Sequence, residues 1–362
     1  MTIYWILFFI LIILSTLEQH QLFNKKTYNY TIILTCIFII FIIGFRYNSV
    51  DYIGYKEHYY LVQSGHIGFP LYLMYESGSE FLFSSMMVLF KSIKLPFFIF
   101  IFVFSVISLS IKFIVFKKYS PYFFLSLVLF FSFLVHKDLG QIRNAMIAAI
   151  MLIAVFFIYK RKIFHFSFTI FTAFCIHFFI LISLPIYWLY PLLRNNYTVI
   201  IILIIATLTF LSGGLLHHIE PILSSNNDIY IFRRLLRYIN DPIHGEEVSL
   251  NINVISQFFF AIILISLKKS YLKKGSYQEG LYVVYIYGFF MYLIFSDVAT
   301  LSARTIELIV YLPLTILIPY YIYQIQRNSI RYFIYYLIII FATIRFIPTS
   351  SNMEIYQNVL FK

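Results

Sequence analysis

The chain has 362 residues, of which 61% are hydrophobic and only 12% are charged, with a net charge of +12 and a mean hydropathy of +0.86. An ordinary soluble domain is about 25% charged, so this composition excludes a soluble globular domain. Apolar runs recur from end to end without alternating polarity, which excludes a β-barrel and predicts an all-α polytopic membrane protein.

The apolar runs predict about 12 transmembrane helices in a single membrane domain over residues 1–362. The first run lacks the basic start and the small-residue cleavage site of a signal peptide, so we expect it to stay in place. The expected spans lie near 3–17, 29–45, 97–116, 121–136, 141–159, 163–177, 178–193, 197–216, 252–267, 279–296, 304–324 and 330–347.

Basic clusters between the spans set the orientation, because cytoplasmic loops carry an excess of Lys and Arg. This bias explains the positive net charge without a nucleic-acid partner. Placing every cluster in the cytoplasm puts the amino terminus outside and requires an even number of spans between clusters. The clusters are Lys25/Lys26, Lys117/Lys118, Lys160/Arg161/Lys162, Lys268/Lys269 with Lys273/Lys274, and Arg327/Arg331.

The requirement for an even number of spans between Lys162 and Lys268 makes a specific prediction. Residues 163–193 must form a hairpin of two short spans that turns near its middle, which places His177 near the outer surface. A single long tilted span is the alternative.

The same count leaves two larger external, periplasmic loops, 46–96 and 217–250. Within the first, the apolar residues 81–83 and 86–90 follow an acidic start and end in lysines. This segment is too short for a comfortable span, and we expect an interfacial amphipathic or re-entrant helix.

Four arginines accompany His177 at the expected outer surface. Arg46 ends the second span, Arg143 and Arg304 open later spans, and Arg237 lies in the second external loop. Because this placement opposes the positive-inside bias, we expect these groups to hold an anion. Arginine suits phosphate through its bidentate fork, and a helix amino terminus adds free N–H groups.

Structural explanations compete with this one. Each arginine could simply extend to the lipid head groups, and Arg304 could pair with Glu307 or Asp297. The two cysteines, Cys36 and Cys175, lie inside apolar runs and indicate neither a disulfide framework nor a metal site. No spacing typical of a metal centre occurs.

Tyrosines cluster at the start of the first external loop, interleaved with carboxylates. Aromatic faces beside carboxylates suit sugar rings, and an interfacial aromatic belt is the alternative. The cluster consists of Tyr47, Tyr52, Tyr55, Tyr59 and Tyr60 with Asp51 and Glu57.

Six short signatures occur in order between about residues 40 and 320: GFRYNSVDYIGYKEHY, ESGSEFLFSSMMVLFKSI, GQIRNAMIAAI, AFCIHFFILISLP, LLRYIN and SARTIELIVYLPLTI. In this order they resemble the EpsG/Wzy group of bacterial polysaccharide polymerases. Two positions depart from the usual pattern of that group. Ser49-Val50 replaces a Gly before Asp51, and Arg143-Asn144 replaces an Arg-Gln pair.

The resemblance implies a glycosyltransferase-C-like architecture in the bacterial inner membrane and an activity on its periplasmic face. A growing glycan on undecaprenyl diphosphate would be transferred to a sugar hydroxyl of a new lipid-linked oligosaccharide unit. The product would be O-antigen of lipopolysaccharide or a similar surface polysaccharide. No cofactor or nucleotide-sugar site is expected, because the donor is already lipid-bound. A chain-length regulator protein is a candidate partner.

The chemistry of this transfer gives each candidate a role. Cations must neutralise the diphosphate as it leaves, and we expect Arg143 and Arg304 first, then Arg237 and Arg46. The acceptor hydroxyl needs a general base, for which Asp51, Glu80 and His177 remain candidates. The candidate sugar-binding residues are Tyr47, Tyr52 and Tyr238.

Three rival functions remain. A flippase or transporter of lipid-linked oligosaccharide is expected to show inverted repeats and charges along a central path, and we find neither a repeat nor midplane charges in the sequence. An O-antigen ligase would share the donor and the side of the membrane. An acyltransferase would need a histidine beside a polar partner facing an acyl carrier from inside.

Overall fold

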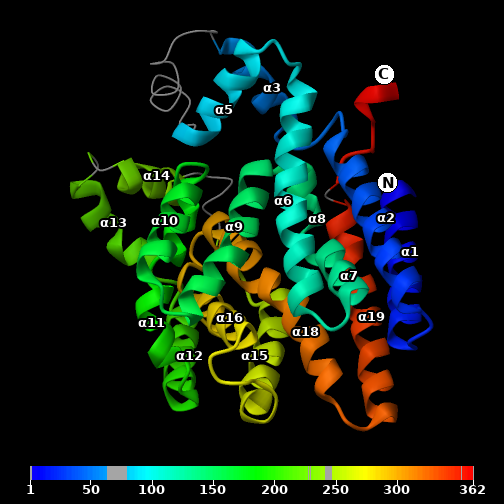
Figure 1. Cartoon of the computed structure of the whole chain (residues 1–362). Helices are drawn as coiled ribbons and strands as arrows, with labels where there is room; N and C mark the ends of the chain where they lie inside the picture. The colour runs from blue at the N-terminus through cyan, green and yellow to red at the C-terminus, as the bar shows by residue number, and fades with distance from the viewer. Residues whose placement is uncertain are drawn as a thin grey trace. The chain divides into compact units, whose positions relative to one another are not determined.

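The computed structural model describes residues 2–62, 80–226, 228, 230–240, 247–351 and 353–361. Over these residues the chain is helical and has no named strand (Figure 1). The helices form two compact units. Unit 1 comprises Met1–Ile153, Phe168–Leu181 and Leu314–Lys362, and unit 2 comprises Ala154–Ser167 and Ile182–Pro313. Each unit is described by itself below.

Each of the twelve expected apolar runs is helical in the structure, which confirms an all-helical, multi-pass membrane protein. By length and composition, seven helices of the described chain could cross a membrane, or eight if one bent pair counts as a single span. The seven are Thr2–Gln19, Lys25–Gly44, Phe97–Tyr119, Ile142–Tyr159, Ile252–Tyr271, Ala299–Gln324 and Asn328–Ser351. The remaining expected spans correspond to shorter helices, to the bent pair or to a helix rich in tyrosine.

Unit 1 is a bundle of long apolar helices. In it α7 packs against both α1 and α19, and α2 packs along α6. Its helices are α1 (Thr2–Gln19), α2 (Lys25–Gly44), α3 (Tyr52–Leu61), α5 (Phe81–Ser92), α6 (Phe97–Tyr119), α7 (Phe123–Phe133), α8 (Val135–Gly140), most of α9 (Ile142–Tyr159), the second half of α10 (Ile163–Phe174), the start of the 3₁₀-helix η1 (Phe178–Ser183), most of α18 (Leu312–Gln324), α19 (Asn328–Ser351) and the 3₁₀-turn η3 (Val359–Phe361).

A carboxylate fixes the α1–α7 contact. Glu18, buried near the end of α1, accepts hydrogen bonds from the backbone N–H groups of Phe123 (2.8 Å) and Phe124 (2.9 Å) at the start of α7, and from the Tyr28 hydroxyl (2.6 Å). The first N–H groups of a helix have no partner within the helix, and an anion there is favoured by the helix dipole. Glu18 therefore caps α7 from a distance of about a hundred residues in sequence.

The helices α3 and α5 lie at one end of α6 in unit 1 (Figure 1). The helix expected from the short apolar segment is α5, and it buries one face through Phe83, Ser84 and Met87. Residues 63–79 of the expected loop 46–96 lie outside the described residues.

Unit 2 is built around α16, which is buried along most of its length and packs against α11, α12, α15, α17 and η2. Gly288 allows α16 to approach η2 closely, since a Cβ there would lie 2.7 Å from the carbonyl oxygen of Ile309. The elements of this unit are α11 (Ile186–Leu193), α12 (Asn196–Leu211), α13 (Leu216–Ser225), α14 (Tyr230–Ile239), α15 (Ile252–Tyr271), α16 (Tyr277–Ile294), α17 (Ala299–Thr305) and the π-helical turn η2 (Ile306–Tyr311).

The second expected loop, 217–250, contains two helices that pack on each other, α13 and α14. The α12–α13 pair bends by 81° at a short break, as a broken span or a re-entrant loop does. Residues 227, 229 and 241–246 of this loop lie outside the described residues.

The predicted hairpin over residues 163–193 is confirmed. The ring of Phe166 in α10 stacks on that of Tyr187 in α11, with centroids 5.2 Å apart, and Arg161 donates to the Tyr187 carbonyl. A single long span would hold these residues far apart, because a helix rises 1.5 Å per residue. The chain turns at residues 175–177, between α10 and η1, so His177 lies at the turn.

Candidate functional site

The carboxylate of Glu80 joins two other predicted site residues in unit 1. Its Oε2 lies 2.7 Å from Arg143 Nη1, and its Oε1 lies 2.9 Å from His177 Nδ1. Oε1 also accepts a hydrogen bond of 3.2 Å from the backbone N–H of Phe178. The structure therefore brings together Glu80, Arg143 and His177, which three separate signatures of the sequence contribute.

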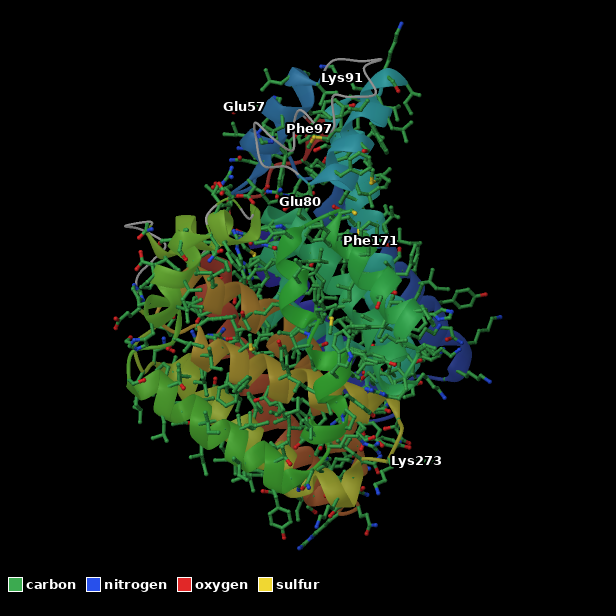
Figure 2. The ribbon with its side chains drawn as sticks, turned by 90° about the vertical axis from the view of Figure 1, so that its left-hand side faces the viewer. Glu57, Glu80, Lys91, Phe97, Phe171 and Lys273 are labelled. Atoms are coloured by element: carbon green, nitrogen blue, oxygen red, sulfur yellow. The ribbon has the colours of Figure 1, made fainter. Side chains whose placement is uncertain are left out.

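Local structure explains why these side chains meet. Glu80 is the residue before α5, in extended conformation, and the N–H of Leu82 donates to the Cys175 carbonyl (2.7 Å), which docks the start of α5 on the turn after α10. Arg143 is the second residue of α9. In Figure 2, Glu80 lies below Phe97 of α6 and above Phe171 of α10.

Two aromatic rings lie beside the Arg143 guanidinium and leave part of the side chain exposed. Its guanidinium carbon lies 5.6 Å from the ring centre of Tyr55 and 5.4 Å from that of Phe83. Its side chain is 25% exposed, and its buried Nε has no hydrogen-bond partner among the described residues. The exposed part of this guanidinium can donate hydrogen bonds to a ligand oxygen.

Asp51 joins the cluster through Tyr55. The Tyr55 hydroxyl donates to Asp51 Oδ2 at 3.2 Å, within the first turn of α3. Tyr55 is buried and Asp51 is only half-buried. All three candidate bases of the sequence analysis therefore lie within two contacts of Arg143.

The electrostatics of Glu80 argue against a role as base. Burial by itself raises the pKa of this carboxyl, but the hydrogen bond from His177 and the charge of Arg143 outweigh it and lower the pKa to about 2. A general base works best when its pKa lies near the working pH. Glu80 is thus a permanent anion that orients its two partners.

Arg46 and the two tyrosines beside it occupy different environments. Arg46 is 2% exposed, and its Nη1 donates to the Ile43 carbonyl (2.6 Å) and to Ser105 Oγ (3.3 Å). This burial favours a structural role for Arg46 in place of the expected diphosphate contact. Tyr47 and Tyr52 lie together with ring centres 5.6 Å apart, but only Tyr47 is partly exposed.

In unit 2 the structure brings Arg304 and Tyr238 together. Arg304 Nη1 donates to the Tyr238 hydroxyl, and its guanidinium carbon lies 4.8 Å from the ring centre. The Asp297 carboxylate, one of the two alternative partners expected for Arg304, lies beside His217 instead. The side chain of Arg237, in α14, lies outside the described residues.

A histidine–carboxylate pair in unit 2 was not predicted. Asp297 is fully buried, accepts from the backbone N–H of His217 (2.8 Å) and lies 3.3 Å from His217 Nδ1. Gly214, at φ +90°, allows this approach, since a Cβ there would lie 2.5 Å from the Asp297 carboxyl carbon. The two residues are 80 positions apart, and only the unusual pair Gly213-Gly214 hints at a close approach.

A buried ion pair in unit 1 corrects the expectation that no charges lie in the middle of the spans. Lys112, inside the candidate span α6, lies 2.6 Å from Asp138 Oδ2, and both side chains are 2% exposed. Ser108 donates to the same carboxylate at 3.1 Å. The sequence signal for this pair is the lysine within the apolar run SLSIKFIVF, which the sequence analysis does not single out. Because both charges are paired and enclosed, they offer no free group to a passing substrate.

No group of three or more His, Cys, Asp or Glu side chains that could hold a metal ion occurs among the residues the structure describes. A family model described as the EpsG family matches residues 29–360 of the chain. No curated protein and no solved structure matches the chain significantly.

Proposed function

Because the chain belongs to the EpsG family, a group of Wzy-type polymerase-like membrane proteins, we propose that it polymerises lipid-linked oligosaccharide repeat units. The donor is a growing glycan on undecaprenyl diphosphate, and the acceptor is a sugar hydroxyl of a second lipid-linked unit. The reaction takes place at the periplasmic face of the inner membrane. The observation that carries this proposal is the contact of Arg143, Glu80 and His177 at the amino terminus of α9.

In the proposed reaction the bond between the anomeric carbon and the diphosphate oxygen breaks, and a bond to the acceptor oxygen forms. The diphosphate leaves as an anion, so catalysis depends on cations placed where its charge develops. Arg143 suits this role because its side chain is partly exposed and lies next to the first N–H groups of α9.

Glu80 and His177 are proposed as positioning residues. Their contacts fix the orientation of Arg143, since Glu80 uses one oxygen for the arginine and the other for the histidine. The same carboxylate offsets part of the arginine charge. We therefore expect the phosphate to bind through directed hydrogen bonds as well as through net charge.

Asp51 is proposed as the general base that takes the proton of the acceptor hydroxyl. It is half-buried, and its Oδ2 accepts from Tyr55, whose ring faces Arg143. Tyr55 thus lies between Asp51, the proposed base, and Arg143, the cation proposed to bind the leaving diphosphate. Tyr47, partly exposed beside Tyr52, is the proposed stacking surface for a sugar.

Arg304 is proposed as a second diphosphate ligand, held by Tyr238 in unit 2. The π-helical turn that follows it supports a functional role, because π-turns inside helices occur frequently at functional sites.

A glycan ladder tests the proposal. Arg143→Ala, expressed in a strain without the native protein, should stay inserted and produce glycan of a single repeat unit in place of long chains. Arg327→Ala is the matched control, because Arg327 is exposed and lies in a loop. Long chains from Arg143→Ala contradict the role of Arg143. Complete loss of attached glycan, including the single unit, indicates an O-antigen ligase.

A further inference from the structure

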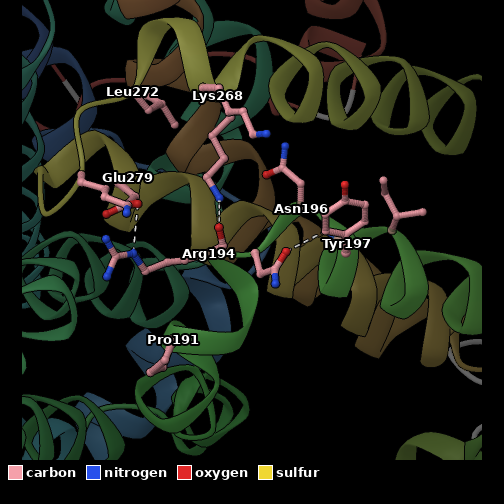
Figure 3. Close-up of a pocket in the computed structure, with 11 residues that line it drawn as sticks. Pro191, Arg194, Asn196, Tyr197, Lys268, Leu272 and Glu279 are labelled. Atoms are coloured by element: carbon pink, nitrogen blue, oxygen red, sulfur yellow. Dashed lines mark hydrogen bonds and ion pairs between the residues drawn. The ribbon is translucent and has the colours of Figure 1, made fainter.

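Unit 2 contains a cavity of about 820 Å³ that the proposed reaction does not use. It lies where the turn between α11 and α12 meets the loop between α15 and α16 (Figure 3). The charged side chains that line it are Arg194, Lys268, Lys269, Lys274 and Glu279. Four cations thus share the cavity with one carboxylate.

That carboxylate is already fully engaged. Glu279 is buried and accepts from Arg194 Nε (3.0 Å), the Tyr190 hydroxyl (3.1 Å) and the backbone N–H of Gly275 (2.7 Å). Figure 3 shows the Arg194 contact and the Lys268 ammonium directed at the Arg194 carbonyl. Glu279 therefore offsets Arg194 and acts on Lys268, and no ion pair joins it to Lys269 or Lys274.

Donor groups remain available in this cavity. Lys268 is only 7% exposed and already donates to the Arg194 carbonyl, so the available donors lie on its neighbours. Lys269 and Lys274 are exposed and form no hydrogen bond or ion pair with another described side chain. Arg194 uses only its Nε in an ion pair, so its two terminal nitrogens can donate to a ligand. Oxygens of a phosphate match such a set of donors.

The apolar surroundings identify the class of ligand. Tyr197, Ile200 and Leu272 also line the cavity. Ile200 begins an exposed apolar face of α12 that continues through Ile201, Ile204, Ile205 and Leu208. A soluble phosphate would gain nothing from such a face, whereas acyl chains attached to the phosphate would lie along it.

We propose that this cavity binds the phosphate head group of an anionic phospholipid, with its acyl chains along α12. Basic pockets between membrane helices on the side rich in Lys and Arg are suited to such lipids. The site is independent of the proposed polymerase chemistry.

Native mass spectrometry of the delipidated full chain in detergent tests the proposal, with phosphatidylglycerol, phosphatidylcholine and inorganic phosphate as probes. The wild type should retain phosphatidylglycerol in preference to phosphatidylcholine. The double variant Lys269→Gln/Lys274→Gln should weaken that binding by about fivefold per lysine, or about 25-fold in total. Both lysines are exposed and form no hydrogen bond or ion pair with the described residues, so the variant should fold normally.

The matched control is Lys25→Gln/Lys26→Gln, which removes two exposed lysines of another basic cluster and should leave binding unchanged. If both double variants lose phosphatidylglycerol binding to the same extent, the binding depends on general surface charge and the proposed site is wrong. Equal retention of the two lipids, or an adduct of inorganic phosphate without a lipid adduct, overturns the lipid assignment.

Discussion

Glu80 and Arg143, 63 residues apart in the sequence, form an ion pair of 2.7 Å in which only the arginine is partly exposed. The glutamate side chain is 6% exposed and the arginine side chain 25%. The pair thus presents a cation at the edge of unit 1 and keeps its counter-ion inside. This asymmetry is the arrangement that an anion ligand requires, and it motivates the first two predictions.

Glu80→Gln should destabilise the protein and abolish long glycan chains. The amide keeps the shape but removes the charge that holds Arg143 and His177, and breaking a buried pair costs about 3 kcal/mol. The measurement is the thermal unfolding midpoint in detergent together with the glycan ladder. Glu354→Gln is the control, because Glu354 is exposed and lies outside the helices. If Glu80→Gln matches the wild type in both measurements, the positioning role is wrong.

The stabilisation by Glu80 should be lost at acid pH. Burial raises the pKa of Glu80, but His177 and Arg143 lower it further, to about 2 from an ordinary 4.5. A carboxyl whose pKa falls on folding stabilises fully above its unfolded pKa and loses this effect as pH falls toward the folded pKa. The difference in unfolding midpoint between wild type and Glu80→Gln should therefore shrink as the pH falls from about 4.5 toward about 2. A difference that stays constant over this acid range contradicts the lowered pKa of Glu80.

Asp51→Asn should lower the polymerisation rate by about 100-fold or more while leaving stability nearly unchanged, because a general base contributes to the rate and this one is half-buried. Tyr55→Phe should have a smaller effect, since it removes one hydrogen bond to Asp51 and keeps the ring beside Arg143. Rates with purified lipid-linked units separate the two variants. Full activity in Asp51→Asn would show that Asp51 is not the base and would favour a histidine. His177 and His217 are the candidates, because each lies beside a carboxylate.

Tyr238→Phe should raise the KM for the lipid-linked donor about tenfold, because a hydrogen bond to a charged group is worth about 1.4 kcal/mol or more. Arg304→Ala should in addition restrict products to a single repeat unit. Steady-state kinetics with donor and acceptor varied separately will locate the defect. A change confined to the KM for the acceptor would place Arg304 at the sugar acceptor and not at the diphosphate.

The side of the membrane can be measured directly. In a Cys36→Ser/Cys175→Ser background, Glu57→Cys should react with a membrane-impermeant maleimide in intact spheroplasts. Lys26→Cys should react only after permeabilisation. Both positions are exposed, so the reagent can reach them. Labelling with the opposite pattern places the Arg143 cluster on the cytoplasmic side and contradicts a periplasmic reaction.

The sequence by itself determined the class of protein and the helical segments. Apolar runs long enough to cross a bilayer must satisfy their backbone groups internally, and each of those predicted here is helical. Charge parity also located the turn at His177, because the Lys and Arg bias acts on loops that sequence makes visible. Arg143 and Arg304 could be singled out for the same reason, since a cation at the start of a span stands out in an apolar sequence.

Only the tertiary structure decided which polar groups meet. Glu80 and His177 are 97 residues apart, and Asp297 and His217 are 80 apart, so no local spacing relates them. Burial likewise separated Arg46 from Arg143, two arginines with similar positions at the ends of spans but different exposure. The physical reason is that a charged side chain in an apolar protein can be buried only with a suitable partner. Packing between helices that are distant in the sequence determines that partner.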